Sequence, residues 1–352
     1  MAKIISGIQQ MGIGVPDVEK IWKWYRKFFG NDIKMFEEAA EAPLMISYTG
    51  NKVQSRTATL AINLQGGGGF EIWQYKSRPT EKANFEIQLG DLGIYICKIK
   101  CKDVKAAYEF YKKEGVEILG ELENDIAGNL HFYCKDPNGN IFEIVKAHDI
   151  FKETKSLCGG VAGAVLGVSD MDKAIKLYSG ILGYDKVTAD KTDVFSDLAG
   201  LPGGKNKVRR VLLTHSQKRK GPFSELLGIT EIELVQVTDR SPKKIFENRF
   251  WGDWGYIHLC FDVKDMEGLK KECEAAGFPF TVDSGSTFDM GEAAGRFSYI
   301  EDPDGTLIEF VETHKIPIAK KLNWYLDLRK RPAEKPLPRW LLKMLKMNRV
   351  KG

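Results

Sequence analysis

The chain has 352 residues, with 52 Lys and Arg against 48 Asp and Glu, a formal net charge of +4. This length is enough for two or three domains or several small repeats, and the composition is typical of a globular protein. No apolar run has the length of a membrane-spanning helix, so the sequence predicts no transmembrane segment.

Four segments along the chain share one strand-like pattern, which begins with Gly and ends in an Asp able to cap a following helix. These segments are GIQQMGIGVPD (7–17), GIYICKIKCKD (93–103), GVAGAVLGVSD (160–170) and GYIHLCFDVKD (255–265). Each is followed by apolar residues at helical spacing and then by Gly, which favours a helix that ends there. The sequence therefore predicts four copies of a strand–helix unit.

Each helix is followed by shorter strand-like runs, and the last run of every unit contains a Glu. These last runs are GFEIWQY (69–75), IFEIVKA (141–147), EIELVQV (231–237) and LIEFVET (307–313). In units two and four an Asp-Pro turn with Asn-Gly or Asp-Gly precedes the last run, which predicts a hairpin. The whole chain is thus predicted to be α+β, with four βαβββ units.

The predicted boundaries place the units at residues 5–80, 90–150, 158–240 and 252–315. Residues 316–352 lie outside the repeats as a basic extension. From Lys315 to the end, twelve basic residues oppose two acidic ones, a net of +10, so the remainder carries about −6. An acidic body argues against nucleic-acid binding. The extension is expected to dock on the body or on a second subunit; a membrane surface or an anionic substrate tail are the alternatives.

The six cysteines are scattered along the chain, and the first residues lack the layout of a secretion signal. Such spacing favours reduced thiols and a cytoplasmic protein over a disulfide framework. The partner expected from these features is a small-molecule substrate, and the protein is expected to be a monomer or a homodimer.

Four βαβββ units with a site residue on the first strand and a Glu on the last resemble the vicinal oxygen chelate superfamily, which includes glyoxalase I. The resemblance covers roughly residues 5–315. It implies that two units pair into a curved, open-barrel sheet with a metal in its cup. It also implies that the ligands come from the fourth residue of each 11-residue segment and from the Glu of the last strand.

These positions hold a side chain of ligand type in units one and four, and at only one of the two places in units two and three. They are Gln10 and Glu71, Ile96 and Glu143, Gly163 and Glu233, and His258 and Glu309. If neighbouring units pair, each of two cups lacks one ligand. If the outer units pair, one cup holds all four ligands and the other loses both first-strand ligands. The second arrangement is the more economical, and the choice stays open at this point.

The set Gln10, Glu71, His258 and Glu309 is similar to the ligands of the zinc type of glyoxalase I. The resemblance implies a divalent metal, Zn²⁺ first, with Ni, Mn, Co or Fe as alternatives. It implies a lyase or isomerase that shifts a proton alpha to a carbonyl through a metal-bound enediolate. Glu309 is predicted to be the base and Glu71 the second acid or base.

Three other functions are compatible with the sequence. One is an epimerase resembling methylmalonyl-CoA epimerase, and another is an Fe-dependent extradiol dioxygenase, although that class has a second His where Gly163 lies. The third is a metal-free binding protein of the bleomycin-resistance kind, in which the strand Glu residues are inherited without a metal. The aromatic residues Phe250, Trp251 and Trp254 lie just before His258, where they would form a pocket wall or a packed linker.

Overall fold

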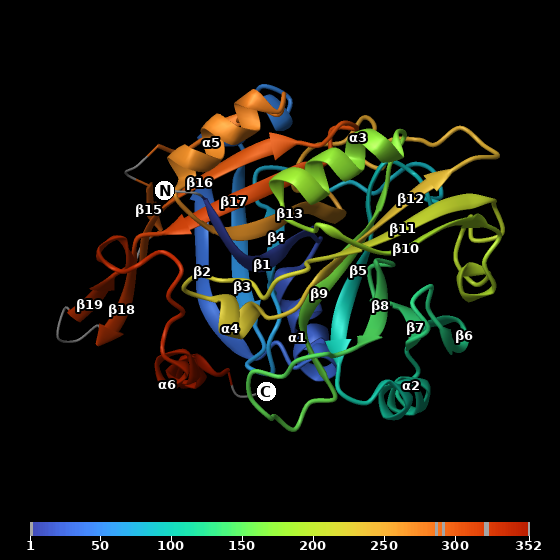
Figure 1. The fold of residues 1–352 in the computed structure, drawn as a ribbon, viewed down its shortest axis with the longest axis horizontal. Coiled ribbons are helices and arrows are strands. Elements are labelled where there is room, and N and C mark those ends of the chain that lie inside the picture. The colour runs from blue at the N-terminus through green and yellow to red at the C-terminus, as the bar shows by residue number, and fades with distance from the viewer. Residues whose placement is uncertain (1–2, 286–287, 291–292, 320–323, 351–352) are drawn as a thin grey trace.

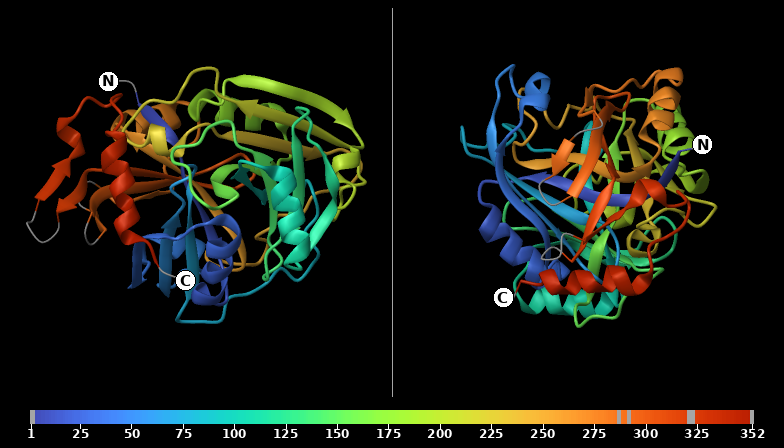
Figure 2. Two further views of the ribbon diagram at one scale, coloured as in Figure 1. Left: turned by 90° about the horizontal axis from the view of Figure 1, so that it is seen from below. Right: turned by 90° about the vertical axis from the view of Figure 1, so that its left-hand side faces the viewer.

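The computed structural model describes residues 3–285, 288–290, 293–319 and 324–350. Two curved, open sheets lie side by side in it, and the longer helices cover one face of each (Figures 1 and 2). Within these residues one sheet has nine strands and the other has eight. The predicted α+β architecture with two curved open-barrel sheets is confirmed.

The outer sheet is built from the first and last units of the chain. Its order is β14 (Val282–Asp283), β16 (Ala293–Glu301), β17 (Leu307–Thr313), β13 (Gly255–Lys264), β1 (Ile4–Gly14), β4 (Gly69–Tyr75), β3 (Ser55–Ile62) and β2 (Ile33–Glu41), with β15 (Phe288–Met290) beside β16. β1 and β13 pair antiparallel in the middle, and each pairs in parallel with the last strand of its own unit. Of the two pairings left open by the sequence, the structure therefore has the crossed one.

The inner sheet repeats this plan with units two and three. Its order is β10 (Lys186–Asp193), β11 (Val208–Thr214), β12 (Glu231–Val237), β9 (Cys158–Gly167), β5 (Gly93–Cys101), β8 (Ile141–Lys146), β7 (Leu130–Lys135) and β6 (Ile118–Asn124). β5 and β9 pair antiparallel in the middle, as β1 and β13 do in the outer sheet. The two sheets thus place equivalent positions of the repeat at equivalent places.

The repeat helices follow the capping signals in the sequence. They are α1 (Val18–Phe29), α2 (Val104–Lys113), α3 (Met171–Ile175) and α5 (Met266–Ala275). Asp17 accepts a hydrogen bond from the Lys20 backbone N–H at 3.0 Å, and the other three helices have the same Asp cap. Gly30 ends α1 at φ 65°, a left-handed conformation that suits glycine. α3 differs, because residues 176–181 continue it as a π-helix.

One apolar core joins the two sheets. It contains the helix-facing residues of β1, β4, β5, β8, β9, β12, β13 and β17 together with the buried faces of α1, α2, α3 and α5. Two hydrogen bonds tie consecutive units across it: Tyr25 donates to Asp136 at 2.8 Å, and Tyr178 donates to Asp302 at 3.1 Å. Both Asp residues also accept backbone N–H groups of the predicted turns. The faces away from the helices are consequently the ones left for sites.

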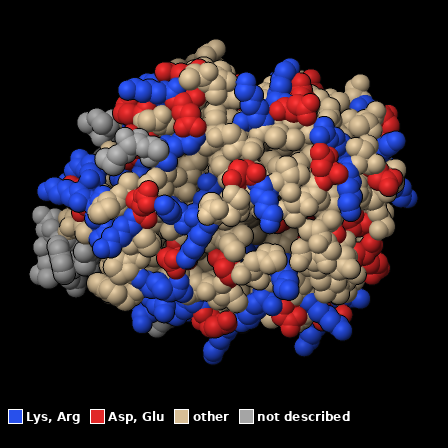
Figure 3. Space-filling view, viewed as in Figure 1, with Lys and Arg blue, Asp and Glu red and all other residues tan. Residues whose placement is uncertain are grey.

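The C-terminal extension packs on the body. It contains β18 (Lys315–Ala319), β19 (Trp324–Asp327), a short turn (Leu328–Lys330), α6 (Arg339–Lys343) and a 3₁₀ turn (Met344–Asn348). Leu328, Leu337 and Leu342 are buried against the end of the outer sheet. Lys and Arg side chains gather over this region on the left of Figure 3. The described residues thus show an arm docked on the body, one of the arrangements expected from the sequence.

The remaining short helices connect the strands and are η1 (Pro43–Tyr48), η3 (Ser196–Leu198) and α4 (Ser224–Leu227). Among the described residues, no helix combines the length and apolar character needed to cross a membrane. All six cysteines are buried free thiols.

Candidate metal centre

Four adjacent strands of the outer sheet each present one polar side chain to the same point. β1 carries Gln10, β4 carries Glu71, β13 carries His258 and β17 carries Glu309. Their chain neighbours on these strands, such as Leu259 and Phe310, point into the apolar core. The period of two along a strand therefore sends the polar set to the opposite face. We call this set the outer cup.

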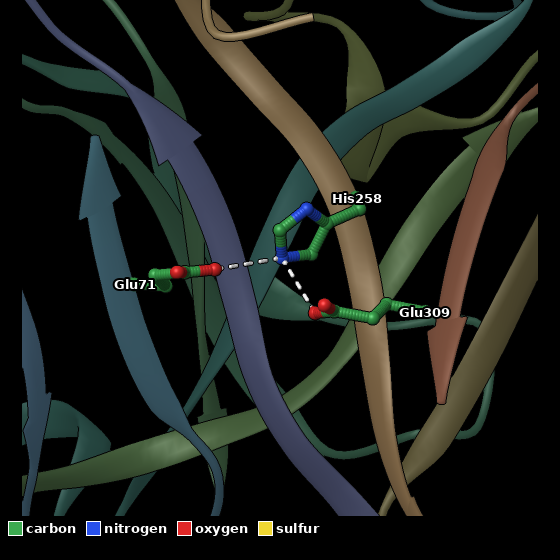
Figure 4. A group of neighbouring side chains, drawn as sticks. All are labelled: Glu71, His258 and Glu309. Atoms are coloured by element: carbon green, nitrogen blue, oxygen red, sulfur yellow. Dashed lines mark ion pairs between the residues drawn. The ribbon is translucent and has the colours of Figure 1, made fainter. Parts of the chain in front are cut away.

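The side-chain nitrogen and oxygen atoms of the outer cup lie within contact distance of one another. His258 Nε2 is 3.3 Å from Glu71 Oε2 and 3.2 Å from Glu309 Oε2. Figure 4 shows the two carboxylates approaching this nitrogen from two sides. The Gln10 amide nitrogen lies 3.1 Å from Glu71 Oε2 and 3.4 Å from Glu309 Oε2. Residues up to 299 positions apart in sequence thus meet at one point.

The donor set fits a divalent cation. One imidazole, two carboxylates and one amide are nitrogen and oxygen ligands of the kind that zinc, manganese and related ions accept. The ligand atoms of Glu71, His258 and Glu309 all lie within 4.8 Å of one another. His258 Nε2 is buried and makes no hydrogen bond to any residue that the structure describes. A buried ring nitrogen without a hydrogen bond, facing two carboxylates, is placed as a metal ligand would be.

The electrostatics of the cup point the same way. Burial raises the pKa of the Glu309 carboxyl above its usual value, and the nearby Glu71 adds to this while His258 opposes it. Burial alone would lower the pKa of His258, but the charges of Glu309 and Glu71 raise it above the ordinary value. Both shifts show that the cluster favours added positive charge at its centre, which a proton or a metal ion supplies.

Aromatic side chains enclose His258. Tyr299 OH lies 3.4 Å from His258 Nδ1, the ring nitrogen that points away from the carboxylates. Trp251 stacks on the imidazole with centroids 6.2 Å apart, and it meets Trp73 edge-on at 4.2 Å. The hydroxyl of Tyr299 is therefore placed to orient the ring, as outer partners of metal-bound His residues do.

Of the three aromatic residues predicted to form a pocket wall, only one lies against His258. Trp251 contacts His258, whereas the Trp254 indole donates to Thr80 Oγ1 at 2.9 Å and Phe250 is 37% exposed. The sequence-based search missed Tyr299. Its signal was weak, because Tyr299 lies opposite Glu309 in the β16–β17 ladder and only that pairing brings it to the site.

The equivalent positions in the inner sheet do not form such a set. Ile96 packs in an apolar cluster, and Gly163 has no side chain. A Cβ at Gly163 would lie 1.9 Å from the Glu231 carbonyl oxygen, so no ligand-bearing residue fits there without a shift of the main chain. Glu143 and Glu233 remain, and both are buried.

Comparisons with known proteins agree with the fold. A family model described as the Glyoxalase/Bleomycin resistance protein/Dioxygenase superfamily matches residues 7–144 and 160–310. Glyoxalase I from Zea mays is 16% identical over 88% of this chain and 92% of that chain, with a TM-score of 0.53. A putative dioxygenase from Bacillus subtilis is 14% identical over 99% of this chain and 98% of that chain, with a TM-score of 0.56.

At these identities the likeness to solved structures shows the fold alone, and no curated protein sequence matches the chain. The family model, however, covers most of the chain in two tandem stretches. Each stretch contains two of the βαβββ units, in agreement with the repeats seen in the sequence and the sheets. The chain therefore belongs to the glyoxalase/bleomycin resistance protein/dioxygenase superfamily.

Proposed function

We propose that the outer cup binds one divalent metal ion through Gln10, Glu71, His258 and Glu309. We propose further that the protein is a lyase or isomerase of the glyoxalase I type, which moves a proton alpha to a carbonyl. The observation that carries this proposal is the convergence of two carboxylates on the buried His258 Nε2, which has no hydrogen bond among the described residues. Zn²⁺ is the first candidate because one nitrogen and three oxygen donors suit it.

A bound divalent cation stabilises negative charge that develops on neighbouring substrate oxygens. The protein residues perform the proton transfer. Glu309 is the base that takes the proton from the carbon alpha to the carbonyl, and it returns the proton to a neighbouring carbon. Contact with Tyr299 and Trp251 holds the His258 ring in its place between the two carboxylates. Gln10 supplies an uncharged amide, so the ligand set carries two negative charges.

Epimerisation is the second candidate, and the placement of the two carboxylates favours it. Glu71 and Glu309 come from β4 and β17, on opposite sides of the central β1–β13 pair. One carboxylate removes a proton from a carbon while the other, protonated, delivers one to the opposite face of the same carbon. The two reactions share the first step and differ in where the proton returns.

The test begins with the metal content of the purified protein and its titration with Zn²⁺ and Mn²⁺. Wild type is expected to bind one ion per chain, and Glu309→Gln to bind it more weakly. Glu312→Gln is the matched control, because Glu312 lies on the other face of the same strand and contacts the Asp265 backbone N–H at 3.0 Å. A wild-type protein that neither carries nor gains an ion would contradict the metal assignment and favour a metal-free binding protein.

The reaction is tested by the uptake of solvent deuterium at the carbon alpha to a carbonyl, followed by NMR over a panel of hydroxycarbonyl compounds and thioesters. Exchange should depend on Glu309 and on the metal. Deuterium at the original carbon with inverted configuration identifies an epimerase, whereas deuterium on the neighbouring carbon identifies the glyoxalase type. Unchanged exchange in Glu309→Gln would refute the role of Glu309 as the base.

A further inference from the structure

The inner sheet carries a lysine at the place that corresponds to Gly12 of the outer sheet. In the outer sheet Gly12 lies opposite Glu71 on one side and His258 on the other. In the inner sheet Lys98 lies opposite Glu143 on one side and Gly163 on the other. The glycine and the basic residue have thus exchanged strands at the centre of the sheet. In the outer sheet the glycine leaves room for the imidazole, because a Cβ at Gly12 would lie 2.4 Å from His258 Nε2.

The ammonium group of Lys98 lies between the two last-strand carboxylates. Its Nζ atom is 3.2 Å from Glu143 Oε2 and 2.8 Å from Glu233 Oε2, and a third carboxylate oxygen, Glu231 Oε1, is at 2.8 Å. In the outer cup, His258 Nε2 is 3.2 and 3.3 Å from the corresponding oxygens. A basic nitrogen therefore occupies the same place between the same two Glu positions in both sheets.

The remaining carboxylate oxygens of the inner cup are held by further basic groups. His131 Nδ1 is 2.7 Å from Glu143 Oε1, and the Arg210 Nε–H donates to Glu233 Oε1 at 2.7 Å. Lys98, Glu143 and Glu233 are at most 1% exposed. We call Lys98, His131, Glu143, Arg210 and Glu233 the inner cup. Its carboxylates are already matched by positive groups without any added ion.

We propose that Lys98 is a tethered cation that takes the place of a metal ion in the inner cup and closes that cup to metals, so that of the two cups only the outer one is left to bind an ion. An ammonium has three N–H donors and no lone pair. Lys98 donates hydrogen bonds to Glu231 and Glu233 and forms an ion pair with Glu143, and its positive charge leaves no place there for a second cation. This proposal concerns the inner cup and holds whatever reaction the outer cup performs.

The charge state of Lys98 supports this assignment. Burial alone would lower the pKa of the lysine, but Glu143, Glu231 and Glu233 raise it well above its ordinary value. Removing the ammonium would leave several buried carboxylates without their central positive charge. Such a group of oxygen ligands suits a hard divalent cation such as Mn²⁺.

The test counts Mn²⁺ by electron paramagnetic resonance in a background without the outer site, His258→Ala/Glu309→Gln. This background is expected to bind no Mn²⁺. Adding Lys98→Ala is expected to create a site for one Mn²⁺ per chain, and adding Glu143→Gln should abolish that site. Lys98→Met is the matched control, because it removes the charge and fills the space, and it should gain no ion. The melting temperature of the Lys98→Ala protein should rise with added Mn²⁺.

Two results would overturn the proposal. One is a folded Lys98→Ala protein, in the same background, that binds no Mn²⁺. The other is Mn²⁺ binding in the background itself that Glu143→Gln removes, since the inner cup would then accept a metal beside Lys98. The second result decides the question even if Lys98→Ala does not fold. Failure of the outer site appears separately, as wild-type protein that binds no metal.

Discussion

Gly12 lies directly against the imidazole of His258, and its lack of a side chain is a requirement of the outer cup. A Cβ at this position would lie 2.4 Å from both Nε2 and Cε1 of His258 and 2.7 Å from Cδ2. Ordinary contacts of a Cβ begin at 3.4 Å, so the ring would have to retreat by about 1 Å. Trp251 and Tyr299 contact the same ring and limit that retreat. Gly12→Ala should therefore displace the ligand without touching its chemistry.

The expected effects can be stated as magnitudes. Overpacking of this kind costs about 1–3 kcal/mol of unfolding free energy. A shift of about 1 Å in a functional group is sufficient for a loss of roughly 100-fold, here expected in the affinity for Zn²⁺. The assay is a competition titration of Zn²⁺ against a coloured chelator, together with urea unfolding of the metal-free protein. Gly180→Ala is the control, since a Cβ there meets nothing within 4 Å.

A double-mutant cycle separates this steric mechanism from a general weakening of β1. If Gly12→Ala acts through the imidazole, it should cost little stability in a His258→Ala background, where the ring is absent. The two substitutions would then be strongly non-additive, as expected for residues in contact. Wild-type affinity for Zn²⁺ in Gly12→Ala, or full additivity of the two stability changes, would refute the reasoning.

Two further predictions concern the same face of the outer sheet. Burial raises the pKa of Asp262 to about 7, from 3.8 when exposed, so its contribution to stability is full below pH 4 and is lost as the pH rises towards 7. Between these pH values the free energy of unfolding should fall by at most about 4 kcal/mol in wild type through this group, and Asp262→Asn should abolish that fall, as measured by urea unfolding. An equal dependence of the unfolding free energy on pH in the two proteins would contradict this. Tyr299→Phe removes the hydroxyl 3.4 Å from His258 Nδ1 and should weaken Zn²⁺ binding about tenfold with little change in fold, and an unchanged dissociation constant would speak against it.

The repeat made the outer cup predictable from the sequence. Gln10 and His258 are the two copies of one strand position that kept a ligand-type side chain, and the structure pairs their strands. The prediction worked because the copies of the repeat share one strand shape, irregularities included. The register shifts between Ile8 and Gln10 in β1 and between Ile94 and Ile96 in β5, so the same offset from the first glycine reaches the same face in each copy. The metal-binding role of the four residues stays a prediction, as do the unit boundaries, the subunit number and the cytoplasmic location.

The burial of Lys98 among carboxylates could not be predicted from the repeat. It lies two residues after Ile96 and faces the same side of the strand, but a lysine in a strand is usually solvent-exposed. Its burial depends on Glu231 and Glu233, which lie 133 and 135 positions further along the chain. The π-helical continuation of α3 was missed for a related reason: the residues of 171–181 have ordinary helical spacing, and packing decides the local pitch.

Because of the crossed pairing, each cup is a junction between the two halves of the chain. Each family-model match covers two consecutive units, yet each sheet takes one unit from each match. The first match contributes Gln10 and Glu71 to the outer cup, and the second contributes His258 and Glu309, so neither half of the chain contains the whole set. The inner cup joins the same two halves through the ion pairs of Lys98, in the first match, with Glu231 and Glu233, in the second. A salt bridge does not need an exchangeable ion, so the inner cup joins the halves without a metal; if the outer cup binds a metal as proposed, that junction alone would depend on the metal supply.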